Sequence, residues 1–308
     1  MPEQNIESES SSARTAGGRR AAVGPLAKIR LTLEMIKFEH SVFALPFALT
    51  GALLAVRGLP SWRQIFWIVV AMVGARSAAM TFNRIADLKL DALNPRTKSR
   101  PLPTGQLSLG FAVGFTVLAC GVLVLAARQL NPLAFKLSPV AIALLFGYSY
   151  TKRFTWLSHV ILGICLGLSP IAAWIALRGS ISVSVLLLGA AVSLWTAGFD
   201  IIYACQDVEF DHALGLHSLP RRYGIPAALY VSAALHALTF VLLVAVAGME
   251  NLGWIALAGL VAVGVLLAYE HTIVKPHDLA RVNAAFFTVN GYISLLFFFT
   301  WAADILNH

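Results

Sequence analysis

The stretch ISVSVLLLGAAVSLWTAGFDIIYACQDVEFD, residues 181–211, joins a long apolar run to an acidic cluster. Residues 181–204 are enough to cross ~30 Å of hydrocarbon as a helix. Asp200, Tyr203, Asp207 and Asp211 then follow one another at steps of three, four and four residues, so on a helix they share one face. Carboxylates beside hydrocarbon are energetically costly and are therefore candidates for function. The stretch predicts a membrane helix that ends in a polar site.

A matching stripe ends the apolar run at residues 64–86. Arg76, Asn83, Asp87 and Asp91 follow at steps of seven, four and four residues. Both aspartates recur 120 residues later, as Asp207 and Asp211, because 87 + 120 = 207 and 91 + 120 = 211. Either cluster alone is also explained as a helix end with solvated charges. The matched spacing, four spans apart, favours two clusters at the same membrane face that converge on one cavity.

The rest of the chain has the composition of a membrane protein. Hydrophobic residues make up 58% and charged residues 12%, with a mean hydropathy of +0.76, against roughly 25% charged residues in soluble domains. We expect an all-α polytopic bundle formed by a single domain, residues 25–308, behind a disordered tail, residues 1–24. Nine apolar stretches are predicted to span the membrane: 38–56, 64–86, 107–127, 137–151 (starting near Pro139), 157–177, 181–204, 225–247, 252–270 and 284–304.

The basic residues are distributed unevenly between the two sets of loops. Of the 23 Lys and Arg residues, 15 lie in one alternating set of loops and tails, 5 in the other, and 3 within or at the ends of spans. This asymmetry follows the positive-inside rule and predicts a cytoplasmic N-terminus. The net charge of +8 therefore indicates membrane orientation and not nucleic-acid binding. Nothing in the sequence indicates an obligate protein partner.

The two acidic clusters have the chemistry of a magnesium site. Two aspartates in each cluster offer one or two oxygen ligands per Mg²⁺ and leave positions for water and phosphate oxygens. Asn83 can add a neutral ligand or orient Asp87. The loop that follows carries Arg96, Lys98 and Arg100 on a proline-stiffened segment, where they suit phosphate oxygens. Ordinary positive-inside charge is the alternative for this loop. Together these features favour chemistry on a lipid diphosphate.

Three further residues are candidates with alternatives left open. Tyr148 and Lys152 stand four apart at the end of the fourth span and can both face the cavity, although Lys152 also suits an interfacial anchor. Arg76 lies deeper in the membrane than Asn83, where a guanidinium needs a partner. That partner is Asp200, another internal group or the carboxylate of a substrate.

These motifs, taken together, resemble those of a known family. Asn83-x₃-Asp87-x₃-Asp91, the loop RTKSRPLPTG at residues 96–105, Tyr148-x₃-Lys152 and Asp200-x₂-Tyr203-x₃-Asp207-x₃-Asp211 are similar to motifs of the UbiA superfamily of intramembrane aromatic prenyltransferases. Within it the chain looks most like the 4-hydroxybenzoate polyprenyltransferases of ubiquinone synthesis. It is also similar to enzymes that prenylate a naphthoate in the futalosine route to menaquinone. The stretch at residues 215–220 departs from the ubiquinone-type pattern, which leaves the acceptor open.

The resemblance implies nine helices around a central cavity with a cytoplasmic cap, in the inner (cytoplasmic) membrane. It implies Mg²⁺-dependent transfer of a polyprenyl group from an allylic polyprenyl diphosphate to a hydroxylated aromatic acid. The expected catalytic residues are Asp87, Asp91, Asp207 and Asp211, which with Asn83 are also the expected Mg²⁺ ligands. The expected substrate-binding residues are Arg76, Asn83, Arg96, Lys98, Arg100, Tyr148, Lys152, Asp200 and Tyr203. A transporter or ion channel is the alternative from another class, which the basic loop after the acidic cluster disfavours.

Overall fold

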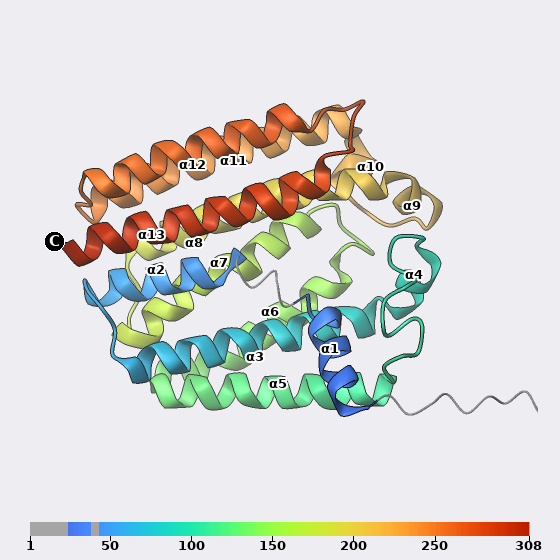
Figure 1. Cartoon of the computed structure of the whole chain (residues 1–308), viewed down its shortest axis with the longest axis horizontal. Coiled ribbons are helices and arrows are strands. Elements are labelled where there is room, and N and C mark those ends of the chain that lie inside the picture. Colours follow the sequence, from blue (N-terminus) through green and yellow to red (C-terminus); the bar gives the residue numbers. More distant parts are fainter. Residues whose placement is uncertain (1–23, 38–42, 308) are drawn as a thin grey trace, which may run out of the picture.

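The computed structural model describes residues 24–37 and 43–307, which form helices joined by short loops (Figure 1). The helices are, in chain order, α1 (Pro25–Met35), α2 (Leu45–Val56), α3 (Trp62–Ala86), α4 (Leu88–Leu93), α5 (Leu109–Leu130), α6 (Pro132–Thr151), α7 (Ser158–Arg178), α8 (Val183–Ala204), α9 (Val208–Ala213), α10 (Leu219–Tyr223), α11 (Ile225–Met249), α12 (Trp254–Ile273) and α13 (Asn290–Asn307). A 3₁₀ turn (Cys205–Asp207) joins α8 to α9, and a π-helical turn (Ala284–Val289) leads into α13. Within the described ranges there is no β-strand, only one isolated bridge between Lys275 and Asp278.

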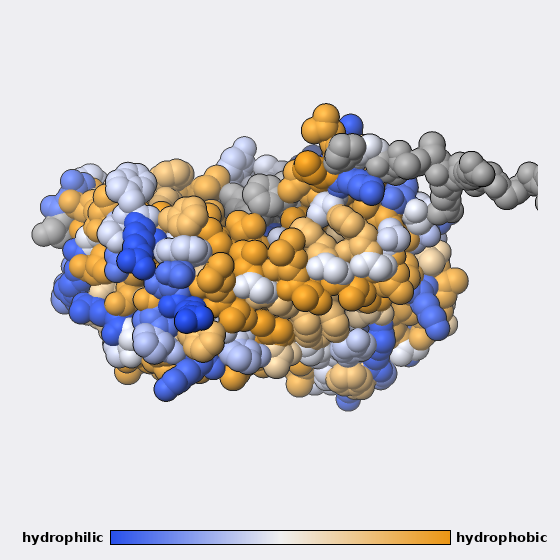
Figure 2. Space-filling view, turned by 90° about the horizontal axis from the view of Figure 1, so that it is seen from below, coloured by the Kyte–Doolittle hydropathy of each residue, from blue (hydrophilic) through white to orange (hydrophobic). Residues whose placement is uncertain are grey.

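The long helices lie side by side as a membrane bundle. Within the described residues, eight helical segments are long and apolar enough to cross a membrane, and α2 is a shorter apolar helix of 12 residues. Figure 2 shows apolar side chains across the middle of the molecule and hydrophilic ones gathered toward its ends. The all-α, multi-pass fold is thus confirmed. The first predicted span, residues 38–56, corresponds to α2, and its residues 38–42 lie outside the described part of the chain.

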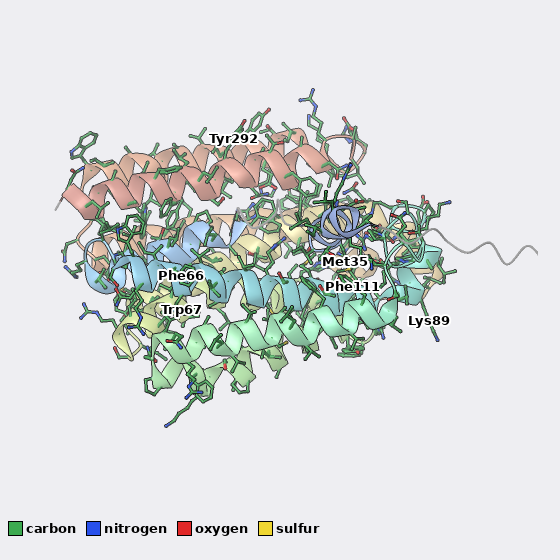
Figure 3. The ribbon with its side chains drawn as sticks, turned by 60° about the horizontal axis from the view of Figure 1, so that its bottom comes forward. Met35, Phe66, Trp67, Lys89, Phe111 and Tyr292 are labelled. Carbon is green, nitrogen blue, oxygen red and sulfur yellow. The ribbon has the colours of Figure 1, made fainter. Side chains whose placement is uncertain are left out.

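The two ends of the bundle differ in chemistry. The short helices α4, α9 and α10 cap one end, which we call the acidic end, and the C-terminus lies at the opposite, distal end (Figure 1). Figure 3 shows Lys89 at the acidic end and the aromatic rings of Phe66 and Trp67 toward the distal end. The helix ends that carry polar clusters therefore meet at one end of the molecule.

One helix start differs from the sequence prediction, and one helix was not predicted. The fourth span begins at Pro132 and not near Pro139, because the Asn131 side chain accepts a hydrogen bond from Ala134 N (2.8 Å) and caps the helix. Pro139 lies inside α6. Residues 1–23 of the predicted tail lie outside the described residues. Gly24 precedes α1, a helix that the sequence reasoning did not anticipate.

Small residues let several helices approach closely. A Cβ atom added at Gly163 would overlap the Ser193 carbonyl oxygen, and one added at Gly51 would lie 2.5 Å from the Pro170 carbonyl oxygen. The first contact joins α7 to α8 and the second joins α2 to α7. Small residues drive helix association in membranes because backbones can then pack directly. These contacts bring α2, α7 and α8 close together.

The two acidic clusters share one backbone geometry. α3 ends at Ala86, Asp87 takes φ −94° and ψ 7°, and Asp91 follows on the short helix α4. α8 ends at Ala204, Asp207 takes φ −105° and ψ 8°, and Asp211 follows on α9. Each cluster was expected to form one continuous helical stripe, but the helix is interrupted at Asp87 in the first cluster and at residues 205–207 in the second. The interruption recurs with the 120-residue offset of the sequence.

Candidate active site

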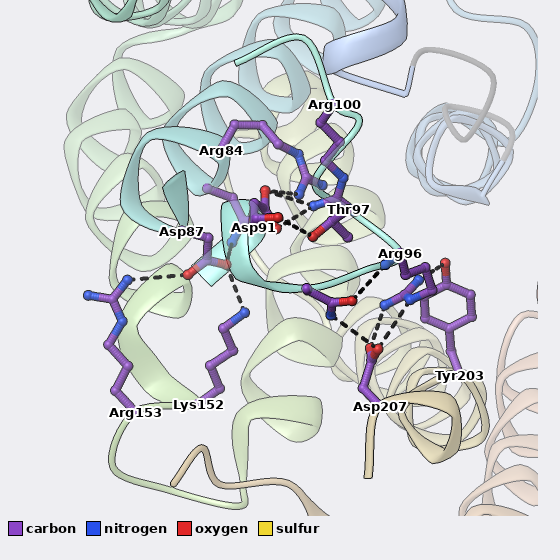
Figure 4. A network of polar contacts seen from close by, with 12 residues as sticks. Arg84, Asp87, Asp91, Arg96, Thr97, Arg100, Lys152, Arg153, Tyr203 and Asp207 are labelled. Carbon is purple, nitrogen blue, oxygen red and sulfur yellow. Dashed lines mark hydrogen bonds and ion pairs between the residues drawn. The ribbon is translucent and has the colours of Figure 1, made fainter. Parts of the chain in front are cut away.

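A polar cavity of about 200 Å³ lies at the acidic end. Both acidic clusters line it, together with the end of α6 and the loop that follows α4. Every site residue expected from the sequence except Arg76 and Lys98 contributes to its wall: Asn83, Asp87, Asp91, Arg96, Arg100, Tyr148, Lys152, Asp200, Tyr203, Asp207 and Asp211. The fold therefore assembles segments more than 100 residues apart around one space (Figure 4).

Asp87 is held by two cations from the end of α6. Lys152 Nζ lies 2.9 Å from Oδ2, and Arg153 donates to Oδ1 at 3.3 Å. Asn83 Nδ2 also donates to Oδ2 at 3.4 Å, the orienting contact that the sequence allowed. Asp87 is only 3% exposed. A buried carboxylate needs such partners because desolvation is otherwise expensive.

Asp91 is bound by two arginines. Arg100 Nη1 lies 2.8 Å from both carboxylate oxygens, and Arg84 Nη1 donates to Oδ2 at 3.3 Å. Thr97 Oγ1 donates to the Asp91 carbonyl at 3.1 Å and ties the loop to α4. Burial and repulsion from Arg84 lower the pKa of Arg100, and Asp91 offsets this only in part. Sequence reasoning missed Arg84, although its spacing of seven residues from Asp91 was a signal that could have found it.

Asp207 is bound from the loop of the other cluster. Arg96 grips its carboxylate with two nitrogens, Nε at 3.1 Å from Oδ1 and Nη2 on Oδ2, and Asn94 Nδ2 donates to Oδ1 at 3.4 Å. Arg96 Nη1 also donates to the Tyr203 hydroxyl at 2.6 Å, and the guanidinium stacks over that ring. Burial lowers the pKa of Arg96, but the charge and hydrogen bonds of Asp207 outweigh it, so the pKa is raised.

A histidine that the sequence did not single out completes the wall. His159 Nε2 accepts a hydrogen bond from Leu219 N (3.4 Å), so Nδ1 of the neutral ring carries the proton and donates to Asp200 Oδ2 at 2.7 Å. His159 sits in the first turn of α7, and no local spacing in the sequence links it to Asp200. The partner of Asp200 is therefore His159 and not Arg76.

The two remaining predicted residues lie outside the cavity wall. Arg76 Nη2 donates to the Lys37 carbonyl at 2.9 Å, on the side of α3 that meets the end of α1. Lys98 is exposed, and its backbone N–H donates to the Asn94 carbonyl at 2.9 Å. The predicted contact of Arg76 with an acceptor carboxylate, and of Lys98 with phosphate, stay predictions.

The donor set of the cavity fits Mg²⁺. Its wall carries five aspartates together with the carboxamides of Asn83 and Asn94, and these are the hard oxygen ligands that Mg²⁺ accepts alongside water and phosphate. Within the described residues no three or more His, Cys, Asp or Glu side chains form a preassembled metal cluster. Asp87, Asp91 and Asp207 are instead paired with Lys152, Arg100 and Arg96 of the same cavity, so it holds negative groups that suit a divalent cation and positive groups that suit an anion.

Comparisons with known proteins agree with this geometry. The UbiA prenyltransferase family matches residues 44–304. The 4-hydroxybenzoate octaprenyltransferase of Vibrio atlanticus (strain LGP32) is 30% identical over 247 residues, 80% of this chain and 86% of that protein. The protein of the same name from Saccharophagus degradans (strain 2-40 / ATCC 43961 / DSM 17024) is 31% identical over 255 residues, 82% of this chain and 84% of that protein.

Solved structures show the same fold. The apo structure of a UbiA homolog from Aeropyrum pernix K1 is 36% identical, with a TM-score of 0.79 over 87% of this chain and 98% of that chain. A UbiA homolog from Archaeoglobus fulgidus, bound to DMAPP and Mg²⁺, is 20% identical, with a TM-score of 0.71 over 89% of this chain and 98% of that chain. The chain therefore belongs to the UbiA prenyltransferase family, and it is an enzyme.

Proposed function

We propose that this enzyme transfers a polyprenyl group from an allylic polyprenyl diphosphate to a hydroxylated aromatic acid in respiratory quinone synthesis, with 4-hydroxybenzoate as the preferred acceptor. The observation that carries the proposal is one cavity, at the ends of membrane helices, that is lined by five aspartates and by four basic side chains, Arg84, Arg96, Arg100 and Lys152. The names of its relatives support the acceptor. The reaction would take place at the inner face of the cytoplasmic membrane.

The proposed metal ligands are Asp87, Asp91, Asp207 and Asp211, with the Asn83 amide beside them. Bound there, Mg²⁺ would supply positive charge that neutralises the diphosphate and stabilises it as a leaving group. Each of the three carboxylates Asp87, Asp91 and Asp207 now has a cationic partner. If these carboxylates bound Mg²⁺, Arg100, Lys152 and Arg96 would be free to donate to phosphate oxygens.

The cations of the cavity then hold the diphosphate. Lys152, Arg96 and Arg100 come from two different segments, so they can contact the diphosphate from two sides. The C1–O bond breaks, the electron pair leaves with the diphosphate, and an allylic cation remains. The Tyr203 ring lines the cavity and would stabilise this cation by about 1–2 kcal/mol, provided that Arg96, which lies over the ring, has moved to the diphosphate. The surrounding apolar helices keep water away and so suppress hydrolysis.

The acceptor ring completes the transfer. Its carbon ortho to the hydroxyl forms the new bond to C1 of the prenyl group, and the ring then loses a proton to a base. We assign this role to Asp200, which lines the cavity and is held by the neutral His159 ring. Asp207, in contrast, is paired with Arg96 in the structure and would be a Mg²⁺ ligand during the reaction. A carboxylate that keeps its negative charge is the better proton acceptor.

The direct test is the identity of the product. Purified protein is incubated with Mg²⁺, a polyprenyl diphosphate and either 4-hydroxybenzoate or a dihydroxynaphthoate, and the products are identified by mass. We expect prenylated 4-hydroxybenzoate that retains its carboxyl group, and no product after the metal is removed with EDTA. Because Leu216 and His217, in the stretch that departs from the ubiquinone-type pattern, line the cavity, the naphthoate is the competing acceptor. Product from the naphthoate alone would reassign the acceptor, and product without metal would refute the Mg²⁺ role.

A further inference from the structure

A buried polar network lies outside the cavity wall, where α8, α12 and α13 meet. Glu270 and Asn290 are both 0% exposed. Asn290 Nδ2 donates to Glu270 Oε1 at 2.9 Å and to the Ala285 carbonyl at 3.0 Å, and its Oδ1 accepts from Trp195 Nε1 at 2.7 Å. Three helices and one turn are thus joined through a single carboxamide.

The Ala285 contact matters because of the backbone there. Residues Ala284–Val289 form a π-helical turn, a rare conformation that occurs mostly as a single insertion, frequently at functional sites. The wider turn shifts the normal pattern of backbone hydrogen bonds. The Asn290 side chain donates a hydrogen bond to the Ala285 carbonyl, five residues earlier in the chain. Asn290 therefore acts as a clamp on this turn, and Glu270 holds the clamp from α12.

The turn carries an aromatic side chain that reaches the active site. The Phe286 ring packs on Tyr203 with centroids 4.2 Å apart, and on Phe199 at 5.1 Å. Tyr203 accepts the hydrogen bond from Arg96, which binds Asp207 through two nitrogens. A shift of the π-helical turn would consequently move Tyr203 and, through it, the arginine at the diphosphate end of the cavity.

We propose that Glu270 and Asn290 are positioning residues for diphosphate binding, which act through the π-helical turn, Phe286 and Tyr203 on Arg96. This inference rests on the proposed function, because it assigns Arg96 to the diphosphate. The network is built for hydrogen bonding and not for apolar packing. Removing one partner leaves the other buried and unsatisfied, so the effect of a substitution depends on whether it keeps the bond.

The surroundings of Glu270 explain why a matched amide should replace it. His236 Nε2 lies 3.2 Å from the Trp195 carbonyl, which can only accept, so Nε2 carries the proton and Nδ1 accepts from His271 Nε2 at 2.9 Å. Glu270 Oε2 lies 3.7 Å from His236 Nδ1, beyond hydrogen-bond distance. The contact that holds the clamp is therefore the one from Asn290 to Oε1, and a glutamine retains that acceptor oxygen.

The experiment compares Asn290→Leu, Glu270→Leu and Glu270→Gln in the full-length protein. The control is Asp304→Asn, because Asp304 is equally buried between α12 and α13 at the distal end, where it accepts from Gly253 N (2.6 Å) and Ala256 N (3.2 Å). Affinity for a non-hydrolysable prenyl thiodiphosphate with Mg²⁺ is measured by calorimetry. Hydrogen exchange of residues 284–290 and the acceptor KM are measured in parallel.

We expect both leucine variants to bind the thiodiphosphate about threefold to thirtyfold more weakly, the range for mutations that act through a packed network. Their residues 284–290 should exchange faster while the acceptor KM stays unchanged. Glu270→Gln should bind as the wild type does, and Asp304→Asn should lose thermal stability without losing affinity. Unchanged affinity in the leucine variants, or an equal loss in Asp304→Asn, would overturn the proposal.

Two further measurements separate the possible failures. If the leucine variants do not fold, Phe286→Leu tests the contact between the π-helical turn and Tyr203 directly. This variant should bind the thiodiphosphate more weakly, while hydrogen exchange of residues 284–290 stays as in the wild type. Wild-type affinity in Phe286→Leu would overturn the path. If the wild type itself bound no thiodiphosphate, the proposed function would fail, and with it the link from the clamp to the diphosphate. Exchange at residues 284–290 would still report whether Asn290 holds the turn.

Discussion

At the scale of single residues, three aspartates of the cavity are each paired with a basic side chain. Arg96 is the most connected of its cations, because it joins Asp207 and Tyr203 from a loop that follows the other cluster. We predict that Arg96→Ala lowers kcat/KM for the prenyl diphosphate by about 10²–10³-fold, the loss typical of removing one donor to a developing charge. The kcat/KM of Arg96→Lys should lie between those of the wild type and Arg96→Ala, because an ammonium group keeps the charge but cannot make a bidentate contact with the carboxylate.

The measurement is steady-state kinetics at saturating acceptor, with Arg128→Ala as the matched control. Arg128 is an exposed arginine in the last turn of α5, at the distal end of the bundle. The Arg128→Ala substitution removes the same charge from the protein without changing a residue of the cavity. A similar loss of kcat/KM in Arg128→Ala would mean that the net charge of the protein, and not the contact of Arg96 with Asp207, decides activity.

His159 permits a separate test of the proton-transfer step. Its Nδ1–H holds Asp200, so we predict that His159→Ala lowers kcat on the order of tenfold, less than the 10²–10⁴-fold expected for the base itself. The KM for the prenyl diphosphate should change little, because His159 has no contact with Arg96, Arg100 or Lys152. His159→Asn should recover part of the rate, since its amide can donate to the same carboxylate. A rise in KM with kcat intact would place His159 in diphosphate binding instead.

At the scale of elements, apolar length and charge spacing predicted the helices and the two stripes, because both are local properties of the sequence. The interruptions at Asp87 and at residues 205–207 were not predictable from spacing, since the same residues would also suit a continuous helix. The start of α6 was misplaced because Pro139 is a strong local signal, whereas the Asn131 cap at Pro132 acts through one hydrogen bond. The contacts of His159 and of the π-helical turn could not be predicted, because they depend on tertiary packing and produce no periodic pattern in the sequence.

Helix packing offers an element-scale prediction at Gly163. A methyl group there would overlap the Ser193 carbonyl oxygen, a backbone atom that can move only with α8. We predict that Gly163→Ala destabilises the bundle by about 1–3 kcal/mol, as overpacking usually does, and shifts Asp200 along with α8. The thermal midpoint in detergent and the rate of product formation should both fall.

Gly121→Ala is the control for this substitution. Gly121 lies on α5, is exposed, and has no atom within 4 Å of an added Cβ. Alanine is the better helix former by roughly 0.5–1 kcal/mol, so this variant should keep or raise the midpoint. Equal destabilisation by both substitutions would show that the close approach of α7 and α8 is not what limits stability.

At the scale of the whole molecule, the acidic clusters and most of the basic residues lie at the same end of the bundle. The acidic clusters, their cap helices and the basic loops occupy one end of the bundle, and the sparsely charged loops occupy the other (Figure 1). The excess of Lys and Arg predicts that the acidic end faces the cytoplasm. A polyprenyl diphosphate would then be bound with its charged head on the cytoplasmic side and its tail among the helices.

The orientation is tested with single cysteines in a variant that lacks Cys120, Cys165 and Cys205, the three free thiols of the described chain. His277→Cys reports on the exposed loop between α12 and the π-helical turn at the acidic end, and Ser180→Cys on the exposed turn between α7 and α8 at the distal end. A membrane-impermeant maleimide added to intact spheroplasts should label Ser180→Cys and spare His277→Cys, and inverted vesicles should give the reverse. The opposite pattern would place the cavity on the outer face, where the positive-inside rule does not allow so many basic residues.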